Sequence, residues 1–429
     1  MKILYPFIIL TLVLLTTINL WIFSKGNLSG VFANPPLAIS QISALLGLQL
    51  MSITLLLSTR SHFLEKLFFG MDNMYKWHKV LGAFSFILIL VHPLILVTQL
   101  LPDVSSSARY MLPGGDLSYN LGIFAIYILV LSFIFIAFVK LPFHIWKFTH
   151  QILGIVFILG GIHSLLVKSD VSLYLPLYYW VIFFVVLGIS SFIYKVFLYK
   201  FIGPKYDFTV EKIERKLDIF YIFLKPIKTL PLFKPGQYFY FSFFGRGISR
   251  EEHPFSIASI KEEGFLKISA KIVGDYTLYL SRIKKGDKAI GWGPYGYFGE
   301  LSTSNGLNQV WIAGGIGVTP FLAMLRNEFI KRSRNDIDFY YLCSTIDEAV
   351  HHEEINLVCQ RIPNIKYTLW CSEEKRRITA VDIVHSIKNL SSVQIHICGP
   401  NQLMNSLKKQ FSFLGIPDER IIMEDFTMI

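Results

Sequence analysis

Residues 77–100 have the sequence WHKVLGAFSFILILVHPLILVTQL, which contains a long apolar run between His78 and His92. A helix needs about 20 mostly apolar residues to cross the hydrocarbon core of a bilayer. The stretch has this length, so it predicts a membrane-spanning helix. Polar side chains inside such a helix are costly to bury and usually have a function, which makes the two histidines candidate functional residues.

Five further apolar runs of similar length lie at residues 4–23, 38–58, 119–139, 147–167 and 174–198. The six runs predict six membrane-spanning helices within residues 1–200. The charges agree, because residues 1–200 contain 12 Lys and Arg and 5 Asp and Glu, whereas residues 201–429 contain 29 and 25. The first part is typical of a membrane protein and the second of a soluble one. This excludes a wholly cytosolic enzyme, a disordered chain and a small disulfide scaffold.

The basic residues predict the orientation of the chain. The loops on one side of the predicted bundle hold Lys2, Arg60, Lys66, Lys76, Lys140, Lys147, Lys195 and Lys200. The loops on the other side hold Lys25, Arg109 and Lys168. The positive-inside rule then predicts a multi-pass protein of the cell membrane with both termini and the soluble half in the cytoplasm. Most of the net charge of +11 lies beside apolar segments, which favours a lipid bilayer over nucleic acid as the partner.

The first 33 residues allow a second interpretation. Lys2, an apolar run and Val31-Phe32-Ala33 together resemble a signal peptide with its cleavage site. The apolar run is long for a signal peptide, so we expect a retained first helix. Either interpretation leaves the second half in the cytoplasm.

Histidines bracket the third and the fifth predicted helices. His78 and His92 are 14 residues apart, and His150 and His163 are 13 apart. Because the two helices run in the same direction, His78 pairs with His150 on the cytoplasmic side and His92 with His163 on the outer side. Neutral imidazole is a suitable axial ligand of haem iron, so the two pairs match the needs of two six-coordinate haems. The helical rise puts the two levels roughly 20 Å apart.

The fifth helix needs a distortion for this arrangement. Fourteen residues return to within about 40° of the same helix face, but thirteen end about 140° away from it. His150 and His163 therefore cannot both point inward from a straight helix. Glycines can permit a kink, and we expect Gly154, Gly160 and Gly161 to do so.

The alternative is that each histidine only packs between helices. One histidine alone would favour that interpretation, but four in two matched pairs favour iron ligation. His62 and His144 lie in cytoplasmic loops beside Arg60 and Lys147 and have no such partners. We interpret them as ordinary loop residues.

Residues 205–300 are typical of a β-rich domain. Aromatic and β-branched residues alternate roughly from Tyr206 to Leu224, and the turn Pro235-Gly236-Gln237 precedes an aromatic strand from Tyr238 to Phe244. Three segments interrupt the strand pattern: His253 to Ile257, Lys271 to Thr277 and Gly293 to Gly296.

Residues 308–429 have a different pattern. Strands are predicted at Gln309–Ala313, Asp338–Cys343 and Gln394–Ile397, with a helix from Phe321 to about Lys331. Alternating strands and helices predict a doubly wound sheet, whose ligand binds at the carboxyl ends of the strands. All four cysteines, Cys343, Cys359, Cys371 and Cys398, lie here without a C-x-x-C motif, which fits a reduced cytosol rather than a zinc ribbon or covalent haem.

The first of these strands leads directly into a glycine-rich turn. Residues 314–320 have the sequence GGIGVTP. Glycines let backbone amides approach a diphosphate, and the N-terminus of the following helix favours the anion. Thr319 can cap that helix, and Pro320 suits its first position because no hydrogen-bond donor is lost there. The alternative is a tight turn without a ligand.

From Ala38 to Phe426 these features together resemble the NADPH oxidase and ferric reductase superfamily, most closely its compact bacterial NADPH oxidases. The resemblance implies a six-helix transmembrane haem-binding bundle at residues 1–200. A ferredoxin-reductase-like β-barrel FAD domain would follow at 201–303, and an α/β nucleotide-binding domain at 304–429. The family's haem ligands have the same spacings of 14 and 13, so the resemblance assigns the iron of two b haems to His78, His92, His150 and His163.

The resemblance also assigns the FAD site. The family's H-P-F-[ST] flavin-binding segment matches His253, Pro254, Phe255 and Ser256, with Ser256 near the reactive flavin nitrogen. The segment around the FAD phosphates matches Lys271, Gly274, Asp275, Tyr276 and Thr277.

The NAD(P)H site is assigned in the same way. The family's nucleotide loop matches Gly314, Gly315, Gly317, Thr319 and Pro320, and its C-G-P segment near the nicotinamide matches Cys398, Gly399 and Pro400. The ending Glu424-Asp425-Phe426 resembles one whose aromatic ring stacks on the flavin. The implied catalytic residues are Ser256, Cys398 and Phe426.

One departure leaves the choice between NADPH and NADH open. Ser344 and Thr345 follow Cys343, in place of an arginine that would bind a 2′-phosphate. The basic stretch 375–377 could supply that charge or could be an ordinary solvated loop. No calcium-binding repeat or proline-rich tail is present in the sequence, so we expect no obligatory regulatory subunit.

The resemblance implies that electrons pass from cytosolic NAD(P)H through FAD and two haems to oxygen outside, forming superoxide. The alternatives are a ferric-chelate reductase, an electron donor to an extracytoplasmic partner protein, and a membrane anchor or channel fused to a flavin reductase. The outer loops lack a carboxylate-rich or histidine-rich patch that would collect iron, which favours oxygen. Arg109 could bind an anionic product or a haem propionate, although an ordinary loop charge is the commoner explanation.

Overall fold

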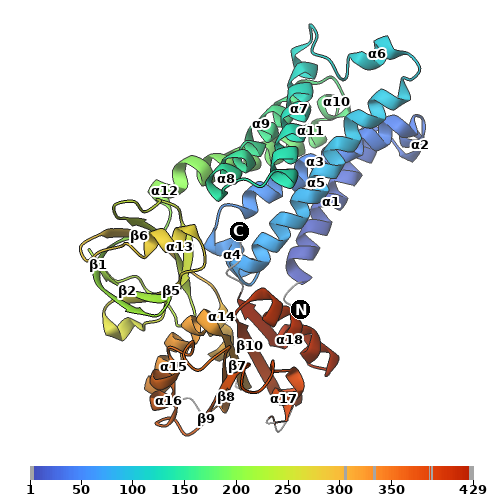
Figure 1. The fold of residues 1–429 in the computed structure, drawn as a ribbon. Helices are drawn as coiled ribbons and strands as arrows, with labels where there is room; N and C mark the ends of the chain where they lie inside the picture. The colour runs from blue at the N-terminus through green and yellow to red at the C-terminus, as the bar shows by residue number, and fades with distance from the viewer. Residues whose placement is uncertain (1–3, 304–306, 332–334, 386, 388–389, 425–429) are drawn as a thin grey trace. The chain divides into compact units, whose positions relative to one another are not determined.

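The computed structural model describes residues 4–303, 307–331, 335–385, 387 and 390–424. The chain divides into two compact units, Met1–Ile202 and Gly203–Met428, and each is described by itself. The first is helical, and the second holds all the described strands (Figure 1).

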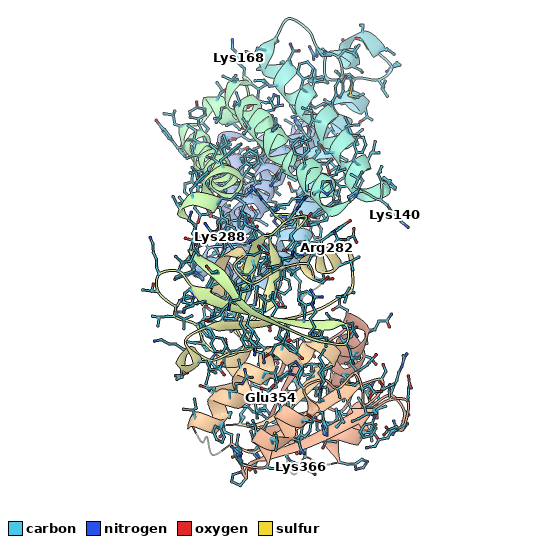
Figure 2. All side chains as sticks on the ribbon, turned by 60° about the vertical axis from the view of Figure 1, so that its left-hand side comes forward. Lys140, Lys168, Arg282, Lys288, Glu354 and Lys366 are labelled. Atoms are coloured by element: carbon cyan, nitrogen blue, oxygen red, sulfur yellow. The ribbon has the colours of Figure 1, made fainter. Side chains whose placement is uncertain are left out.

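Among the described residues, six helices of the first unit are long and apolar enough to cross a membrane, as predicted. They are α1 (Leu4–Ser24), α3 (Pro35–Leu57), α5 (Met71–Gln99), α7 (Leu117–Phe138), the pair α8 and α9 (Phe143–Gln151 and Leu153–Leu166), and α11 (Leu175–Ile193), which continues through a π-turn (Tyr194–Leu198) into α12 (Tyr199–Ile202). Lys140, which follows α7, and Lys168, which follows α9, lie at opposite ends of the bundle (Figure 2).

The fifth span is interrupted between its two histidines, as the 13-residue spacing requires. The interruption lies at Ile152, where α8 ends and α9 begins. Ile152 N donates to Thr149 O at 3.3 Å, and Ile155 N donates to Ile152 O at 2.9 Å, which are the tighter bonds of a 3₁₀ turn. The expectation that the glycines would form the kink was wrong, because all three lie within α9.

Two of these glycines serve helix packing instead. A Cβ at Gly154 would lie 2.1 Å from the Phe192 ring, and one at Gly161 would lie 3.1 Å from Val185. Both partners lie on α11, so the missing side chains let α9 approach α11 closely.

A buried polar contact joins three helices of the bundle. Thr17 of α1 donates its hydroxyl to Gln49 Oε1 of α3 at 2.6 Å and accepts a hydrogen bond from Trp180 Nε1 of α11 at 2.9 Å. Thr17 and Gln49 are at most 1% exposed. In hydrocarbon, such bonds hold helices together because the polar groups have no water as an alternative partner.

The second unit begins with a six-stranded antiparallel sheet in the order β4-β3-β6-β1-β2-β5. The strands are β1 (Lys205–Lys216), β2 (Ile219–Pro226), β3 (Tyr238–Phe244), β4 (His253–Ser256), β5 (Leu266–Lys271) and β6 (Lys288–Tyr295). Just after β4, Ile257 pairs with Ile268 of β5, so the two edge strands meet. This closure gives the predicted barrel, which encloses an aromatic core including Phe208, Phe239 and Phe241.

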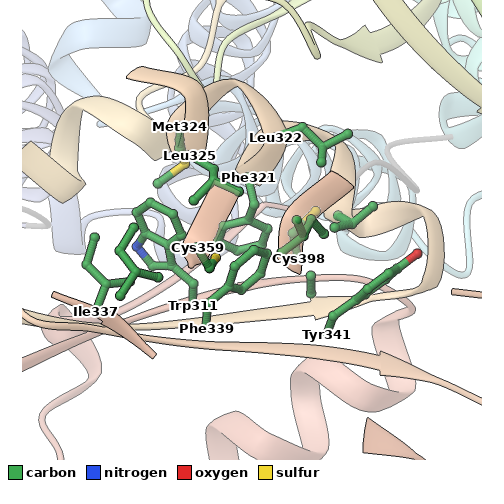
Figure 3. Close-up of a cluster of buried hydrophobic side chains, with 14 of the residues drawn as sticks. Trp311, Phe321, Leu322, Met324, Leu325, Ile337, Phe339, Tyr341, Cys359 and Cys398 are labelled. Atoms are coloured by element: carbon green, nitrogen blue, oxygen red, sulfur yellow. The ribbon is translucent and has the colours of Figure 1, made fainter. Parts of the chain in front are cut away.

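A five-stranded parallel sheet follows, in the order β11-β10-β7-β8-β9. Its strands are β7 (Asn308–Gly314), β8 (Ile337–Cys343), β9 (Ile365–Cys371), β10 (Val393–Cys398) and β11 (Ile421–Glu424). Helix α15 (Thr319–Lys331) packs Phe321 and Leu325 against Trp311 and Phe339 on the sheet (Figure 3). The predicted doubly wound domain is confirmed.

Candidate functional site

The membrane bundle brings the four histidines together in the two predicted pairs. The ring centroids of His78 and His150 are 6.0 Å apart, and those of His92 and His163 are 6.5 Å apart. A metal ion held by one nitrogen of each ring separates two imidazole centroids by roughly 6 Å, since a metal–histidine bond is about 2 Å long. Both pairs therefore have the spacing that a bis-histidine iron needs.

Hydrogen bonds orient three of the four rings. Nδ1 of His78 lies 2.8 Å from Thr54 O, Nδ1 of His92 lies 3.0 Å from Ser40 O, and Nδ1 of His163 lies 2.7 Å from Ser118 O. A carbonyl oxygen only accepts, so Nδ1 carries the proton and donates it. The lone pair then lies on Nε2, which is the state required of a metal ligand.

His150 is held differently. Its Nδ1 is buried and has no hydrogen-bond partner among the described residues. Instead, its ring stacks on Trp146, one helical turn earlier on α8, with centroids 5.2 Å apart and planes 6° apart. Trp146 therefore orients His150 by ring contact, in place of the carbonyl that orients the other three.

A mainly apolar cavity of about 270 Å³ borders the pair His92 and His163. Helices α1, α3, α5, α7 and α9 contribute to its wall. Lys168 and Asp170 are among its polar lining residues, and Asp170 forms an ion pair with Lys25 at 2.6 Å. A mainly apolar cavity beside two imidazoles suits the flat, apolar body of a haem, and polar lining residues such as Lys168 suit its propionates.

Gly122 of α7 lets the His163 ring lie against the helix backbone. A Cβ at Gly122 would lie 3.0 Å from Cε1 and Nδ1 of that ring, closer than ordinary van der Waals contact. If His92 and His163 hold a haem, we expect Gly122→Ala to displace the ring and to weaken retention of that haem by about tenfold. Haem content after purification and the electron paramagnetic resonance spectrum of the ferric protein measure this.

Gly82→Ala is the matched control, because a Cβ at Gly82 would meet Thr54 Cγ2 at an ordinary 3.5 Å. It should keep the full haem content and the spectrum of the unmodified protein. Unchanged haem content and spectrum in Gly122→Ala would show that the close contact does not position His163.

In the second unit, residues of both predicted FAD segments meet. His253 of β4 stacks on Tyr276, with ring centroids 3.6 Å apart, and its Nε2 lies 3.0 Å from Glu251 Oε2. Phe255 and Ser256 are buried at the end of β4, where Ser256 pairs with Tyr238 of β3. Burial and the charge of Glu251 raise the pKa of the Tyr276 hydroxyl, which therefore stays protonated at neutral pH.

The second FAD segment forms a capped turn. Lys271 ends β5 and forms an ion pair with Asp218 at 3.3 Å. Thr277 Oγ1 accepts hydrogen bonds from the backbone N–H of Val273 and Gly274 at 3.0 and 3.2 Å. This turn opens the short helix α13 (Asp275–Leu280). Pro254, Asp275 and the rest of the predicted FAD residues thus lie on two neighbouring segments of one barrel.

The predicted nucleotide residues meet at the carboxyl ends of β7 and β10. The chain leaves β7 toward β8 and β9 on one side and reaches β10 and β11 on the other, so this is the point where strand order reverses. A Cβ at Gly317 would lie 2.4 Å from Cys398 O, and one at Gly314 would lie 3.4 Å from the Gly399 Cα. Gly315 has φ of +54°, which favours glycine. Only glycines allow the two strand ends to approach this closely.

The remaining predicted residues surround these glycines. Thr319 begins α15 and donates its hydroxyl to Ile316 O at 2.8 Å, with Pro320 next in the helix. Pro400 lies against Gly314. Cys398 is fully buried in the apolar cluster beneath α15, so its backbone rather than its thiol borders the glycine turn (Figure 3). Phe426 lies outside the described residues, just beyond Glu424 of β11.

A polar network joining the barrel to the nucleotide-binding sheet was not predicted. Tyr221 O–H donates to His351 Nε2 at 3.3 Å, and His351 Nδ1 donates to Glu354 Oε2 at 3.5 Å. Arg326 contacts the same carboxylate and the backbone oxygen of Ala258. Burial raises the pKa of Glu354, but His351, Arg326 and Lys267 outweigh this and lower it to about 2. The ionised network fixes the two subdomains between which an electron donor and the flavin would meet.

Comparison with protein families gives three matches in chain order. A family described as "Ferric reductase like transmembrane component" matches residues 43–161. A family described as "FAD-binding domain" matches residues 209–291, and one described as "Oxidoreductase NAD-binding domain" matches residues 311–409.

Among curated proteins, one component of the Na⁺-translocating NADH-quinone reductase is similar. The Pseudomonas aeruginosa protein is 24% identical over 196 residues, which is 40% of this chain and 48% of that one. The Neisseria meningitidis protein is 25% identical over 209 residues, which is 42% and 51%. The chain therefore spans about half the length of the curated relatives it matches.

Among solved structures, a flavohemoglobin from Malassezia yamatoensis with bound FAD and heme has a TM-score of 0.52 and 16% identity, covering 94% of this chain and 98% of that one. The flavohem-like FAD/NAD-binding domain of the nitric oxide dioxygenase from Vibrio cholerae has a TM-score of 0.46 and 21% identity, covering 51% and 97%. At 16% identity, the similarity to the flavohemoglobin shows a shared fold and nothing more.

Proposed function

We propose that this chain, which belongs to the NADPH oxidase and ferric reductase superfamily, is a superoxide-forming NAD(P)H oxidase of the cell membrane. In general terms, the chain is a transmembrane, NAD(P)H-dependent flavin oxidoreductase. The proposal adds two b haems that connect a cytoplasmic flavin to oxygen outside. The observation that carries it is that His78 faces His150 at 6.0 Å and His92 faces His163 at 6.5 Å. His78, His92 and His163 each donate Nδ1–H to a carbonyl oxygen, which leaves the lone pair of a metal ligand on Nε2.

The chemistry belongs to the cofactors: when bound, FAD takes a two-electron hydride, and haem iron takes electrons one at a time. The chain holds the groups in place. His78 and His150 would hold the inner haem, and His92 and His163 the outer one. Because two histidines would hold each haem, the outer acceptor would receive its electron without binding the iron.

The domains would divide this work at the predicted boundaries, with haem binding in 1–200, FAD binding in 201–303 and NAD(P)H binding in 304–429. Ser256 would lie by the reactive flavin nitrogen, and Phe426 would cover the flavin. Cys398, Gly399 and Pro400 would border the nicotinamide through their backbone. The distribution of Lys and Arg supports a cytoplasmic position for both termini and for the soluble half.

The acceptor is tested by comparing oxygen with ferric chelates. Purified protein supplied with NADH and FAD should reduce cytochrome c in air, and superoxide dismutase should abolish most of this reduction. Anaerobic reduction of a ferric chelate should be much slower. Fast anaerobic chelate reduction, with cytochrome c reduction insensitive to the dismutase, would instead identify a ferric-chelate reductase or a donor to a partner protein.

A further inference from the structure

The nucleotide site ends in two loops that carry carboxylates. A dinucleotide on a doubly wound sheet places its adenosine ribose near the carboxyl ends of strands beyond the glycine turn, and an acidic residue there selects the 2′-hydroxyl of NAD. In this chain the strands concerned are β8 and β9, next to β7. Both lie within residues 311–409, which match the NAD-binding family.

The backbone holds the two loops side by side. Ser372 N donates to Cys343 O at 3.0 Å, and Glu373 N donates to Ser344 O at 3.1 Å. The loop after β8 also turns back on itself, because Ser344 N donates to Glu348 Oε2 at 3.3 Å. Glu348 and Glu373 are thus anchored at the same strand ends, and both are exposed to solvent and to a ligand.

Two of the three basic residues in the loop after β9 interact with other side chains. Lys375 Nζ lies 4.8 Å from the centroid of the Trp370 ring. Arg376 forms an ion pair with Asp382 at 2.6 Å, and that carboxylate also accepts from the Thr379 hydroxyl at 2.7 Å. The loop after β8, residues 344–350, contains Asp347 and Glu348 and no Lys or Arg. Lys375 and Arg376 therefore already have partners, while Arg377 is exposed.

We propose that Glu348 and Glu373 receive the adenosine ribose of the nucleotide and that the protein consequently uses NADH in preference to NADPH. The 2′-phosphate of NADPH carries about −1.5 to −2 charges at neutral pH and would be repelled by these two carboxylates. The free 2′-hydroxyl of NADH can donate to either carboxylate. This inference rests on the nucleotide-binding part of the proposed function and is independent of the haems and of the acceptor.

Anaerobic flavin reduction in the purified full-length protein, followed by stopped flow with NADH and with NADPH, tests the inference. We expect an efficiency at least about tenfold higher with NADH. Glu373→Arg should shift the ratio toward NADPH by about tenfold or more, and Glu348→Gln should shift it in the same direction by less. Glu419→Arg, the same charge change at an exposed site of the same domain, should leave the ratio unchanged.

A wild-type preference for NADPH would overturn the inference, as would a Glu373→Arg variant whose NADH-to-NADPH ratio equals that of Glu419→Arg. Neither result would affect the proposed oxidase function. Conversely, absence of haem or of superoxide would overturn that function and leave the nucleotide preference measurable.

Discussion

Replacing His92 with alanine is expected to remove one of two haems and to lower superoxide formation by about 100-fold or more, while NADH still reduces the flavin. His92 faces His163 across 6.5 Å and is oriented by Ser40. Without it, His163 is left as a single ligand on one side of the cavity. Haem content, anaerobic flavin reduction and dismutase-sensitive cytochrome c reduction measure the three parts of this result.

His144→Ala is the matched control, because His144 is exposed on α8, four residues after Lys140, and belongs to neither pair. It should keep both haems and full activity. If His92→Ala retained both haems, the assignment of the outer ligand would be wrong. If it lost a haem but kept superoxide formation, the outer pair would not lie on the electron path.

Replacing Gly317 with alanine is expected to slow NADH-driven flavin reduction by about 100-fold, because a shift near 1 Å in a reacting geometry has an effect of this size. The added Cβ would lie 2.4 Å from the carbonyl oxygen of Cys398 and 2.6 Å from its carbon. Both are backbone atoms of β10, so the contact cannot be relieved by rotating a side chain. The glycine turn would have to move away from the strand end.

Two further measurements separate this local effect from misfolding. Gly317→Ala should retain normal FAD and haem contents, and dithionite should still reduce its haems. Gly115→Ala serves as the control substitution, because a Cβ at Gly115 would meet nothing within 4 Å. Normal NADH-driven flavin reduction in Gly317→Ala would contradict the proposed role of the turn.

The sequence predicted the elements and the histidine pairs well for a physical reason. Apolar runs of membrane length and alternating strand patterns are local signals, and the spacings of 14 and 13 residues place His78 with His150 and His92 with His163 once the helices are parallel. The strand from Tyr238 to Phe244 was predicted with its observed bounds.

The details that sequence reasoning missed are nonlocal or belong to the backbone. The interruption at Ile152 involves neither glycine nor proline, so nothing in the residue type marks it. Carbonyl oxygens orient His78, His92 and His163, and every residue has a carbonyl. Tyr221 and His351 are 130 residues apart in sequence and meet only because the barrel packs on the parallel sheet.

The proposed function requires electrons to cross the membrane, which can be measured in sealed vesicles containing the full-length protein. NADH added outside reaches only the molecules whose flavin part faces outward, since it does not cross the bilayer. We expect cytochrome c sealed inside the vesicles to be reduced, and superoxide dismutase sealed with it to suppress that reduction. Oxidation of NADH that reduces only external cytochrome c would contradict the proposed function.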